Sequence, residues 1–446
     1  MGTIAVIDGF RTPFCREGTD LVGCDADFLG GLVVREMKQR LSKWNIPLSI
    51  IDRVVGANVA APLHASNIAR VSARRGGLPV SVPADTIGKN CGSGLSALNN
   101  GCQWIRLGDA HTVLVVGTES MSRIQMAYPY DIVRLFTKLA KEKNTVGKLL
   151  SIVALLKRLI PFWKKENQPL VGLKLGLTDS LCDLIMGLTA ENLARDPSFD
   201  ISRKLQDEYA YFSHKRAAHA EKLGYFDEEI IHAYVPNGSA YACIKRDNGI
   251  RHDITREKLA NMAPFFDRKH GTVTVGNSSQ ITDGAGAMLL MDGEYARTLG
   301  LPILGYLGRY ADVGFDPTRM GLAPAGAIAK LLKMSKRSLA DFRFVELNEA
   351  FAAVVHANWQ ALDSAALMKK FFGDYGFTER IGCIPDEELN PNGGAIALGH
   401  PVGASGIRLA TTALKHLRRI GGGCALVSLC VGGGQGVAMI IESEAS

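Results

Sequence analysis

Two cysteines and a histidine stand beside glycine-rich turns, a setting in which side chains often act as nucleophiles and bases. Cys91 lies in the segment KNCGSG, directly before a turn that is expected to open a helix. The free N–H groups and the positive dipole at a helix start favour the thiolate, which would lower the cysteine pKa. Cys91 is therefore a candidate nucleophile, the alternative being a cysteine that only packs at the helix start.

His400 and Cys430 occupy comparable positions later in the chain. His400 lies in NGGAIALGHPVGASG, on a loop before a second expected helix, where it could act as a base or serve as a hydrogen-bonded structural residue. Cys430 ends an apolar strand and precedes Gly432 and two further glycines. Consecutive glycines at the carboxyl end of a strand can form an anion-binding nest. A packing cysteine is the alternative for Cys430.

Asn348 follows a strand-like run at 344–347 and so lies at a further strand end. Its amide could hold a water molecule or a substrate oxygen. The plain alternative is that Asn348 caps the helix that follows it.

Two distant segments that carry these residues follow one plan. The first runs from Gly94 through a helix-like stretch to Gly108, 14 positions later, and then into an apolar strand at 112–116. The second runs from Gly406 to Gly421 over 15 positions and into a strand at 425–429. Each unit combines a glycine turn, a helix closed by glycine and a buried strand. The repeat predicts a duplicated α/β protein in which each half-chain supplies a mostly parallel sheet covered by helices.

The region between these units has a different character, that of an inserted and largely helical lobe. A helix signal begins at Thr189, and a long charged helix is expected from about Ser202 to Leu223. Residues 131–165 hold nine basic and two acidic side chains, a net charge of +7 that equals the net charge of the whole chain.

The basic segment 131–165 also has apolar residues at helical spacing and ends in Phe162 and Trp163. A basic amphipathic hairpin of this kind fits a membrane surface or a groove on a partner protein. The alternative is a hairpin packed on the main body with a solvated basic face. Nucleic-acid binding is not expected, because interleaved aromatic residues and known nucleic-acid motifs are lacking.

The nine cysteines are scattered over the chain without CxxC pairs, so neither a disulfide framework nor a structural zinc site is expected. The N-terminal residues lead straight into a strand-like run at 4–7 without the features of a signal peptide. No segment reaches about 18 uninterrupted apolar residues. These features favour a cytoplasmic protein, with peripheral membrane contact through 131–165, or a protein of the mitochondrial matrix if a presequence has been removed.

Five segments, in their order along the chain, resemble the thiolases: KNCGSG, GNSSQITDGA, NEAF, GHPVGASG and CVGGGQG. The likeness runs from Ile4 to about Glu442. It implies two βαβαβαββ halves layered α-β-α-β-α, with the N-terminal half at 1–120 plus 269–292, an inserted loop domain at 121–268 and the C-terminal half at 293–446. The basic hairpin and the segment FDRKHGTVT look most like the β subunits of trifunctional-type fatty-acid-oxidation complexes, although these often carry His where Asn348 stands.

The resemblance implies thiolytic cleavage of 3-ketoacyl-CoA by CoA. Cys91 would take up the acyl group, His400 would accept the thiol proton, and Cys430 would protonate the departing acetyl-CoA carbanion. His400 and a water held by Asn348 would stabilise the enolate. The backbone N–H groups of Cys91 and Gly432 would stabilise the tetrahedral acyl intermediate.

The resemblance also implies a CoA site along the inserted lobe and the loop Val275–Ile281, with Ser279 as a polar contact. Phe351, Met186 and Ile281 would line the acyl side. No cofactor or metal would be required, since CoA and acyl-CoA are substrates. The expected assembly is a homodimer or a dimer of dimers, with a hydratase/dehydrogenase α subunit as a further partner.

Three other functions stay open at this point. A decarboxylating ketoacyl synthase shares the duplicated architecture but generally uses a second histidine where Cys430 stands. A biosynthetic acetoacetyl-CoA thiolase would typically carry His before Met186, where this chain has Ile185. A non-catalytic lipid-carrying scaffold would not need to keep Cys91, His400 and Cys430 together.

Overall fold

The computed structural model describes residues 3–160 and 167–444. The chain forms two compact units: Met1–Arg123 together with Asp179–Ser446, and Ile124–Thr178. This division into two units does not decide the domain boundaries inferred from the sequence, which stay a prediction. Phe162, Trp163, Lys164 and Lys165, which the sequence assigned to the basic hairpin, lie outside the described residues.

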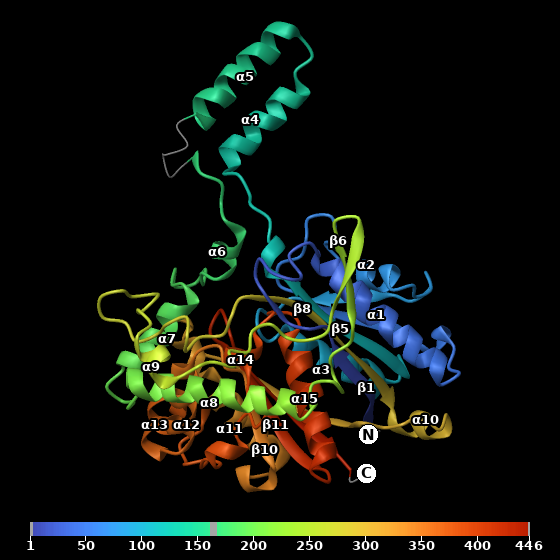
Figure 1. Cartoon of the computed structure of the whole chain (residues 1–446), viewed down its shortest axis with the longest axis vertical. Coiled ribbons are helices and arrows are strands. Elements are labelled where there is room, and N and C mark those ends of the chain that lie inside the picture. Colours follow the sequence, from blue (N-terminus) through green and yellow to red (C-terminus); the bar gives the residue numbers. More distant parts are fainter. Residues whose placement is uncertain (1–2, 161–166, 445–446) are drawn as a thin grey trace. The chain divides into compact units, whose positions relative to one another are not determined.

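The larger unit is built on one ten-stranded sheet (Figure 1). The strands run β10-β11-β12-β9-β1-β8-β5-β3-β4, with β2 paired to β8. Their bounds are β1 Ile4–Arg11, β2 Cys15–Arg16, β3 Arg53–Ala57, β4 Ala84–Ile87, β5 Thr112–Ser120, β8 Thr282–Asp292, β9 Gly305–Gly314, β10 Phe344–Leu347, β11 Gly423–Val431 and β12 Gln435–Ser443. The two half-chains meet where β1 pairs with β9.

The sheet is mixed, so the expectation of mostly parallel halves was wrong. Parallel pairs occur between β3 and β4, β3 and β5, and β10 and β11. The pairs β5–β8, β8–β1, β1–β9, β9–β12 and β12–β11 are antiparallel. Strands buried on both faces are usual in parallel sheets, but here helices cover both faces of antiparallel strands as well, so burial did not reveal direction.

The helices of the larger unit lie between these strands along the chain. They are α1 Ala26–Lys43, α2 Ile68–Arg75, α3 Ser93–Leu107, α7 Met186–Arg195, α8 Arg203–Lys222, α9 Arg256–Ala260, α10 Gly293–Thr298, α11 Ala323–Ser335, α12 Ala352–Leu362, α13 Ala365–Phe372, α14 Ala395–Leu398 and α15 Ser405–Arg419. The first half follows the expected βαβαβαββ order. In the second half, the strand that would precede α15 is reduced to a bridge between Val345 and Leu389.

Local sequence signals account for several helix ends. Gly108 closes α3 with a φ of +79°, a conformation that glycine adopts without strain. Ser202 caps α8 by accepting a hydrogen bond from the Leu205 N–H at 3.2 Å. Helix α7 begins at Met186, three residues before the expected start at Thr189, so Met186 lies at the N-terminus of the helix.

A close approach of α3 and α15 joins the two halves. Both helices contribute apolar side chains to one core with strands from each half. A Cβ atom placed on Gly94 would lie 2.8 Å from the Gly406 Cα atom, so both positions require glycine. Because α3 follows Cys91 and α15 follows His400, this contact brings the two glycine-rich loops together.

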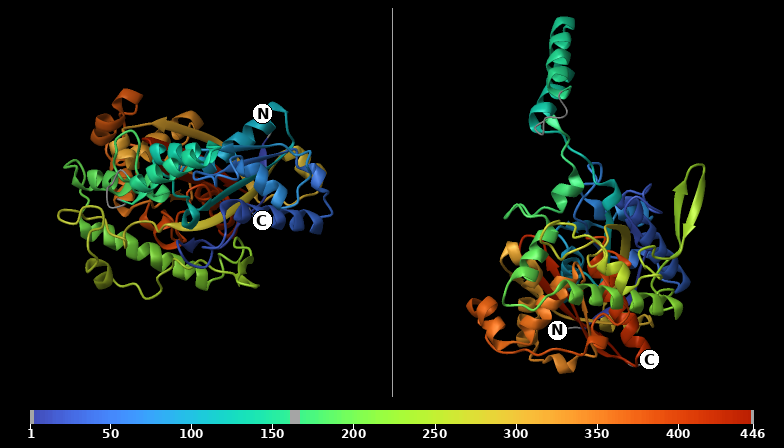
Figure 2. Two further views of the ribbon diagram at one scale, coloured as in Figure 1. Left: turned by 90° about the horizontal axis from the view of Figure 1, so that it is seen from above. Right: turned by 60° about the vertical axis from the view of Figure 1, so that its left-hand side comes forward.

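The inserted lobe also carries a two-stranded ribbon, β6 Ala233–Asn237 paired with β7 Ala240–Ile244 (Figure 2). Ala233 and Val235 on one face of the ribbon pack into the core beneath α1. The opposite face leaves Tyr234 and Tyr241 exposed.

The smaller unit, Ile124–Thr178, contains a helical hairpin. Its helices are α4 Tyr130–Lys141 and α5 Thr145–Leu159, followed by the short α6 Gly172–Gly176. The side chains of Ile132 and Leu155 are buried within it. Within residues 3–160 and 167–444, every helix is too short or too polar to cross a lipid bilayer.

Candidate active site

Cys91 lies between β4 and α3, with Gly92 as the N-cap of the helix. As a whole residue, Cys91 is partly exposed. Burial raises the pKa of Cys91 to about 11, although hydrogen bonds from the backbone N–H groups of Gly432 and Cys91 favour the thiolate and offset part of this rise. The expectation of a lowered pKa was therefore wrong, because loss of hydration outweighs the helix start. The thiol is therefore neutral at rest, and its use as a nucleophile would require a base.

His400 lies on the loop between α14 and α15 and is 7% exposed. Its Nδ1 atom lies 2.6 Å from the Ser405 Oγ atom, and that hydroxyl donates its one proton to the Pro401 carbonyl oxygen at 2.9 Å. Ser405 must then accept from Nδ1–H, which assigns the ring proton to Nδ1 and leaves Nε2 as a proton acceptor. Burial and the nearby Arg408 lower the pKa of His400 to about 4, so the ring is neutral at pH 7.

Asn348 follows β10 and meets His400. Its Nδ2 atom lies 3.5 Å from the His400 Nε2 atom, and its Oδ1 atom is buried with no hydrogen-bond partner among the described residues. The helix-cap alternative is not realised, because the N-cap of α12 is Phe351. An amide that faces a histidine nitrogen and offers a free oxygen can orient a water molecule or a substrate oxygen.

Cys430 lies near the end of β11 and is fully buried. Burial raises its pKa, and a negative charge on Cys91 would raise it further, so the two sulfur atoms lie within electrostatic range. Cys430 also packs in the C-terminal core, as the alternative interpretation supposed. The raised pKa keeps Cys430 as a protonated thiol, which is able to act as an acid.

The glycines after Cys430 form a turn with positive φ at Gly433 and Gly434. The Gly432 N–H points at the Cys91 sulfur, whereas the Gly433 N–H donates to Asp179 Oδ2 at 2.6 Å. A carboxylate of the chain itself thus occupies part of the expected anion-binding nest. A Cβ on Gly432 would lie 3.1 Å from the Met186 Cε atom, which places Met186 against this turn.

The loop Val275–Ile281 passes beside the Asn348 segment. The Ser279 N–H donates to the Ala350 carbonyl oxygen at 2.9 Å, and Val275 is 49% exposed. The guanidinium of Arg251 lies 3.4 Å from the Val275 carbonyl oxygen. Burial lowers the pKa of Arg251, and the positive charge of Arg16 lowers it further. Two cations therefore lie near the loop that the sequence assigned to CoA.

The three expected acyl-side residues occupy different settings. Phe351 is buried in the C-terminal core and makes an edge contact with Phe266 at 5.8 Å between ring centroids. Met186 packs against the same core. Ile281 directly precedes β8, whose first residue, Thr282, contacts Gly399 beside His400.

The carboxylate of Glu349 fixes the Asn348 segment to the inserted lobe. It accepts from the Tyr209 hydroxyl at 2.9 Å and the Ser213 hydroxyl at 2.6 Å, both on α8. It also accepts from the Asn390 side chain at 3.1 Å and the Ile396 N–H at 3.1 Å. Glu349 therefore holds three segments in one arrangement around Asn348.

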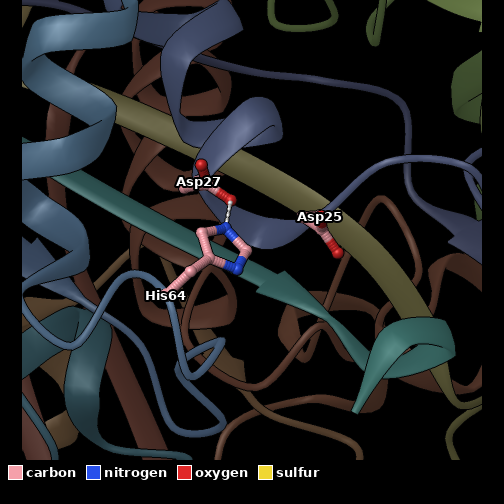
Figure 3. A group of neighbouring side chains, drawn as sticks. All are labelled: Asp25, Asp27 and His64. Atoms are coloured by element: carbon pink, nitrogen blue, oxygen red, sulfur yellow. Dashed lines mark hydrogen bonds and ion pairs between the residues drawn. The ribbon is translucent and has the colours of Figure 1, made fainter. Parts of the chain in front are cut away.

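Among the described residues, one group of His, Cys, Asp and Glu side chains lies close enough to share a metal ion: Asp25, Asp27 and His64 (Figure 3). His64 Nε2 lies 3.2 Å from Asp27 Oδ1. The two carboxylates are already paired with cations, Asp27 with Arg75 and Asp25 with Arg123. This group is an ion-pair network at the start of α1.

Sequence reasoning did not identify Ser405, Arg251, Asn90 or Asp179. Ser405 lies inside the segment GHPVGASG, five residues after His400, so its spacing was a usable signal. Asn90 directly precedes Cys91, but its bond to the Gly432 carbonyl oxygen spans 342 positions. The bond between Asp179 and Gly433 spans 254 positions. Contacts of that range leave no local pattern.

Comparison with known proteins covers nearly the whole chain. Residues 4–294 match the family model for the N-terminal domain of thiolase, and residues 301–443 match that for its C-terminal domain. A 3-ketoacyl-CoA thiolase of Escherichia fergusonii is 35% identical, covering 99% of this chain and 97% of the relative. A probable acetyl-CoA acyltransferase of Staphylococcus epidermidis is 36% identical, with 99% of each chain covered.

The crystal structure of human mitochondrial 3-ketoacyl-CoA thiolase in complex with CoA superimposes with a TM-score of 0.80. Its sequence is 33% identical, and the match covers 100% of this chain and 98% of that one. The two family models together span nearly the whole sequence, with the fold and the glycine-rich loops in the expected order. The chain belongs to the thiolase family.

Proposed function

We propose that this protein is an acyltransferase that cleaves 3-ketoacyl-CoA with CoA, giving acetyl-CoA and an acyl-CoA shortened by two carbons. The observation that carries the proposal is the pair of cysteines within electrostatic range of each other, one of them facing the Gly432 N–H. Relatives named 3-ketoacyl-CoA thiolase support the same reaction. A degradative role in fatty-acid oxidation is consistent with these names.

In the first step, the Cys91 sulfur attacks the C3 carbonyl carbon of the substrate. His400 Nε2 accepts the thiol proton. Burial raises the pKa of the Cys91 thiol and lowers the pKa of the His400 ring, so complete proton transfer between them at rest is strongly unfavourable. Transfer must therefore accompany attack, while the N–H groups of Cys91 and Gly432 stabilise the oxyanion that forms.

The tetrahedral intermediate then loses its C2–C3 bond, which leaves an acyl thioester on Cys91 and the enolate of acetyl-CoA. His400 and a water held by Asn348 stabilise the enolate oxygen. Cys430 donates its proton to C2, and acetyl-CoA leaves. The high pKa of Cys430 suits this step, because the thiol stays protonated until a carbanion is present.

The second half-reaction returns both sulfurs to their starting state. The Cys430 thiolate accepts the proton of the CoA thiol, and the CoA sulfur attacks the thioester carbonyl. The bond from Cys91 to the acyl group breaks, and His400 returns its proton to the Cys91 sulfur. All atoms of the two products come from the thioester 3-ketoacyl-CoA and the thiol CoA, so we expect no metal or cofactor requirement.

The CoA site is proposed along the loop Val275–Ile281, with Ser279 as a polar contact. Arg251 supports this placement, because a guanidinium next to Val275 can pair with a phosphate group of CoA. The acyl chain would run past Met186 and Ile281 toward Phe351.

The proposed function is tested by trapping the acyl-enzyme. Mixing with 3-ketoacyl-CoA and rapid quenching should give a protein whose mass has increased by one acyl group on Cys91, and adding CoA should release it. Cys91→Ala should give no adduct. An adduct of unchanged yield in that variant would overturn the assignment of the nucleophile.

We further propose that the hairpin of α4 and α5 binds an anionic lipid surface. Apolar side chains of α5 and of its C-cap residue Ile160 stay 40–70% exposed; those of α5 are Val146, Leu149, Leu150, Ile152, Val153 and Leu156. Exposed cations stand beside them: Arg134, Lys138, Lys141, Lys143, Lys148 and Lys157. An apolar face bordered by cations fits the boundary between acyl chains and anionic headgroups.

Vesicle sedimentation tests the hairpin proposal. The wild type should bind vesicles with phosphatidylserine and release them at high salt, and Leu149→Glu with Val153→Glu should abolish binding. Activity on a soluble short-chain substrate should not change. The lipid proposal fails if the variant still binds the vesicles. It also fails if the wild type binds a hydratase/dehydrogenase subunit but not the vesicles.

For the assembly, we propose a homodimer formed through strand β4. Among the described residues this strand pairs with β3 on one side only, and an unpaired strand edge is a template for a second copy. Light scattering should give the mass of a dimer or a dimer of dimers. Thr86→Pro removes the backbone N–H of residue 86 from the strand. It should lower that mass if the edge is the interface.

A further inference from the structure

The peptide bond between Gly432 and Gly433 is held at both ends by side chains. Its carbonyl oxygen accepts a hydrogen bond from Asn90 Nδ2 at 2.9 Å. Its N–H donates to Asp179 Oδ2 at 2.6 Å. A peptide unit is planar, so two bonds at opposite ends fix its orientation.

The neighbouring peptide unit supplies the Gly432 N–H that faces the Cys91 sulfur. Gly432 has no side chain to restrict its two backbone torsions, and Gly433 and Gly434 adopt positive φ values of 87° and 70°. A run of glycines is the most flexible backbone available, so this N–H needs external restraint to stay aimed at one point. The restraint on the 432–433 peptide provides it.

Asn90 and Asp179 are themselves anchored. Asn90 has a φ of +44°, and its carbonyl oxygen accepts from the Ser93 N–H at 3.0 Å and the Ser93 hydroxyl at 2.7 Å. Asp179 is 3% exposed, and its second oxygen accepts from the Leu181 N–H at 2.9 Å. Asp179 also donates its own N–H to the Leu184 carbonyl oxygen at 2.8 Å.

We propose that Asn90 and Asp179 are positioning residues that jointly aim the Gly432 N–H at the oxyanion formed on the acyl group of Cys91. Neither side chain touches substrate in this role. The proposal rests on the proposed function, since it assigns the two residues to the acylation step of that reaction.

The physical consequence is selective for one half of the chemistry. Loss of a donor to an oxyanion typically slows a reaction by about 10²–10³-fold, and a loosened donor costs part of that. Stabilisation of the acetyl-CoA enolate uses His400 and Asn348 instead. Weakening the clamp should therefore slow acylation and leave exchange of the acetyl-CoA α-protons intact.

The test uses Asp179→Asn and Asn90→Gly in the full chain. Asparagine keeps the shape of Asp179 but presents an N–H₂ group to one of its two N–H partners. Glycine tolerates the positive φ of residue 90 and removes the amide donor. The matched control is Asp196→Asn, near the end of α7. Asp196 is a buried carboxylate that likewise accepts a hydrogen bond from the backbone N–H two residues later, that of Ser198, at 3.0 Å.

Each variant is mixed with saturating 3-ketoacyl-CoA, and the rate of thioester formation on Cys91 is followed by mass spectrometry. Acylation should slow about tenfold in each clamp variant, and the double variant should slow less than the product of the two, since both bonds hold one peptide. The KM for CoA and α-proton exchange in D₂O should stay within twofold of wild type.

Equal acylation rates in wild type, Asp179→Asn and Asn90→Gly would overturn the proposal, and so would an equal loss of acylation and exchange, which indicates general distortion. A slowed Asp196→Asn variant would overturn it for the same reason. Absence of any Cys91 thioester in the wild type would instead overturn the proposed function itself, and the assignment of the clamp with it.

Discussion

The Nδ1 atom of His400 lies 2.6 Å from the hydroxyl oxygen of Ser405, whose proton is directed to the Pro401 carbonyl oxygen. The hydroxyl can therefore only accept from the ring, and the Nε2 atom is left without a proton. One buried serine thus sets which nitrogen of His400 can act as the base. Because burial keeps the ring neutral, this choice of tautomer decides whether Nε2 can serve as the proposed base.

Ser405→Ala should slow acylation of Cys91 about 10–100-fold. The variant leaves a buried N–H without a partner, at a cost of about 1–3 kcal/mol that the ring relieves by moving its proton to Nε2. The measurement is the single-turnover acylation rate. Ser443→Ala, which removes a buried hydroxyl bonded to the Leu304 carbonyl oxygen at 3.0 Å, is the control and should leave that rate unchanged. Undiminished acylation in Ser405→Ala would show that the tautomer is set by other means.

Cys430→Ala should still form the acyl-enzyme from acyl-CoA but should lose exchange of the α-protons of acetyl-CoA by at least 10²-fold, the usual contribution of general acid–base catalysis. Proton NMR in D₂O follows the exchange. Cys102→Ala, another buried cysteine in a helix core, is the matched control. Exchange at the wild-type rate in Cys430→Ala would refute the proton-transfer role.

Arg251→Ala should raise the KM for CoA about tenfold and change kcat little, because a phosphate contact remote from the reacting carbon contributes to binding in ground and transition states alike. Initial rates at varied CoA give both constants. Arg256→Ala, an exposed arginine paired with Glu208, serves for comparison and should leave both unaltered. An effect on kcat with KM preserved would place Arg251 elsewhere in the mechanism.

Stability should fall as the pH decreases from about 6.5 to 4, partly through His416. Burial and Arg419 lower the pKa of His416 to about 4 in the folded chain. Between these pH values the unfolded chain binds a proton at this residue that the folded chain does not, so acid favours unfolding. The contribution of this half-buried ring is of the order of 1–2 kcal/mol. Thermal unfolding measured at intervals from pH 7.5 to 4.5 should therefore decline less steeply in His416→Gln, and parallel curves would contradict the assignment.

Local patterns predicted the elements that they directly encode. The run at 344–347 forms β10 with those bounds, and Gly108 ends α3 as expected. The strand expected at 4–7 continues to Arg11, because the charge of Arg11 is matched inside the protein by Asp247 at 2.6 Å and Glu229 at 2.8 Å. A polar residue that would end a strand in isolation is thus retained in β1 by partners far along the chain.

The remaining features depend on long-range packing. The candidate residues could be named from glycine-rich segments, but the raised pKa of Cys91 follows from burial that a helix-start argument omits. Strand direction was equally hidden, since β8 and β12 are apolar on both faces in antiparallel pairs. The assignment of Asn90 and Asp179 required the folded chain, because each meets the Gly432–Gly433 peptide across hundreds of positions.

The contact between Gly94 and Gly406 leaves the two halves of the larger unit no freedom to hinge between the loops that carry Cys91 and His400. A methyl group added at either glycine would act as a wedge between the helices, and it would part thiol from imidazole without altering a single reacting atom. Inactivating substitutions should therefore occur at this seam as well as at the cysteines, since a single added carbon would displace the loops that carry Cys91 and His400.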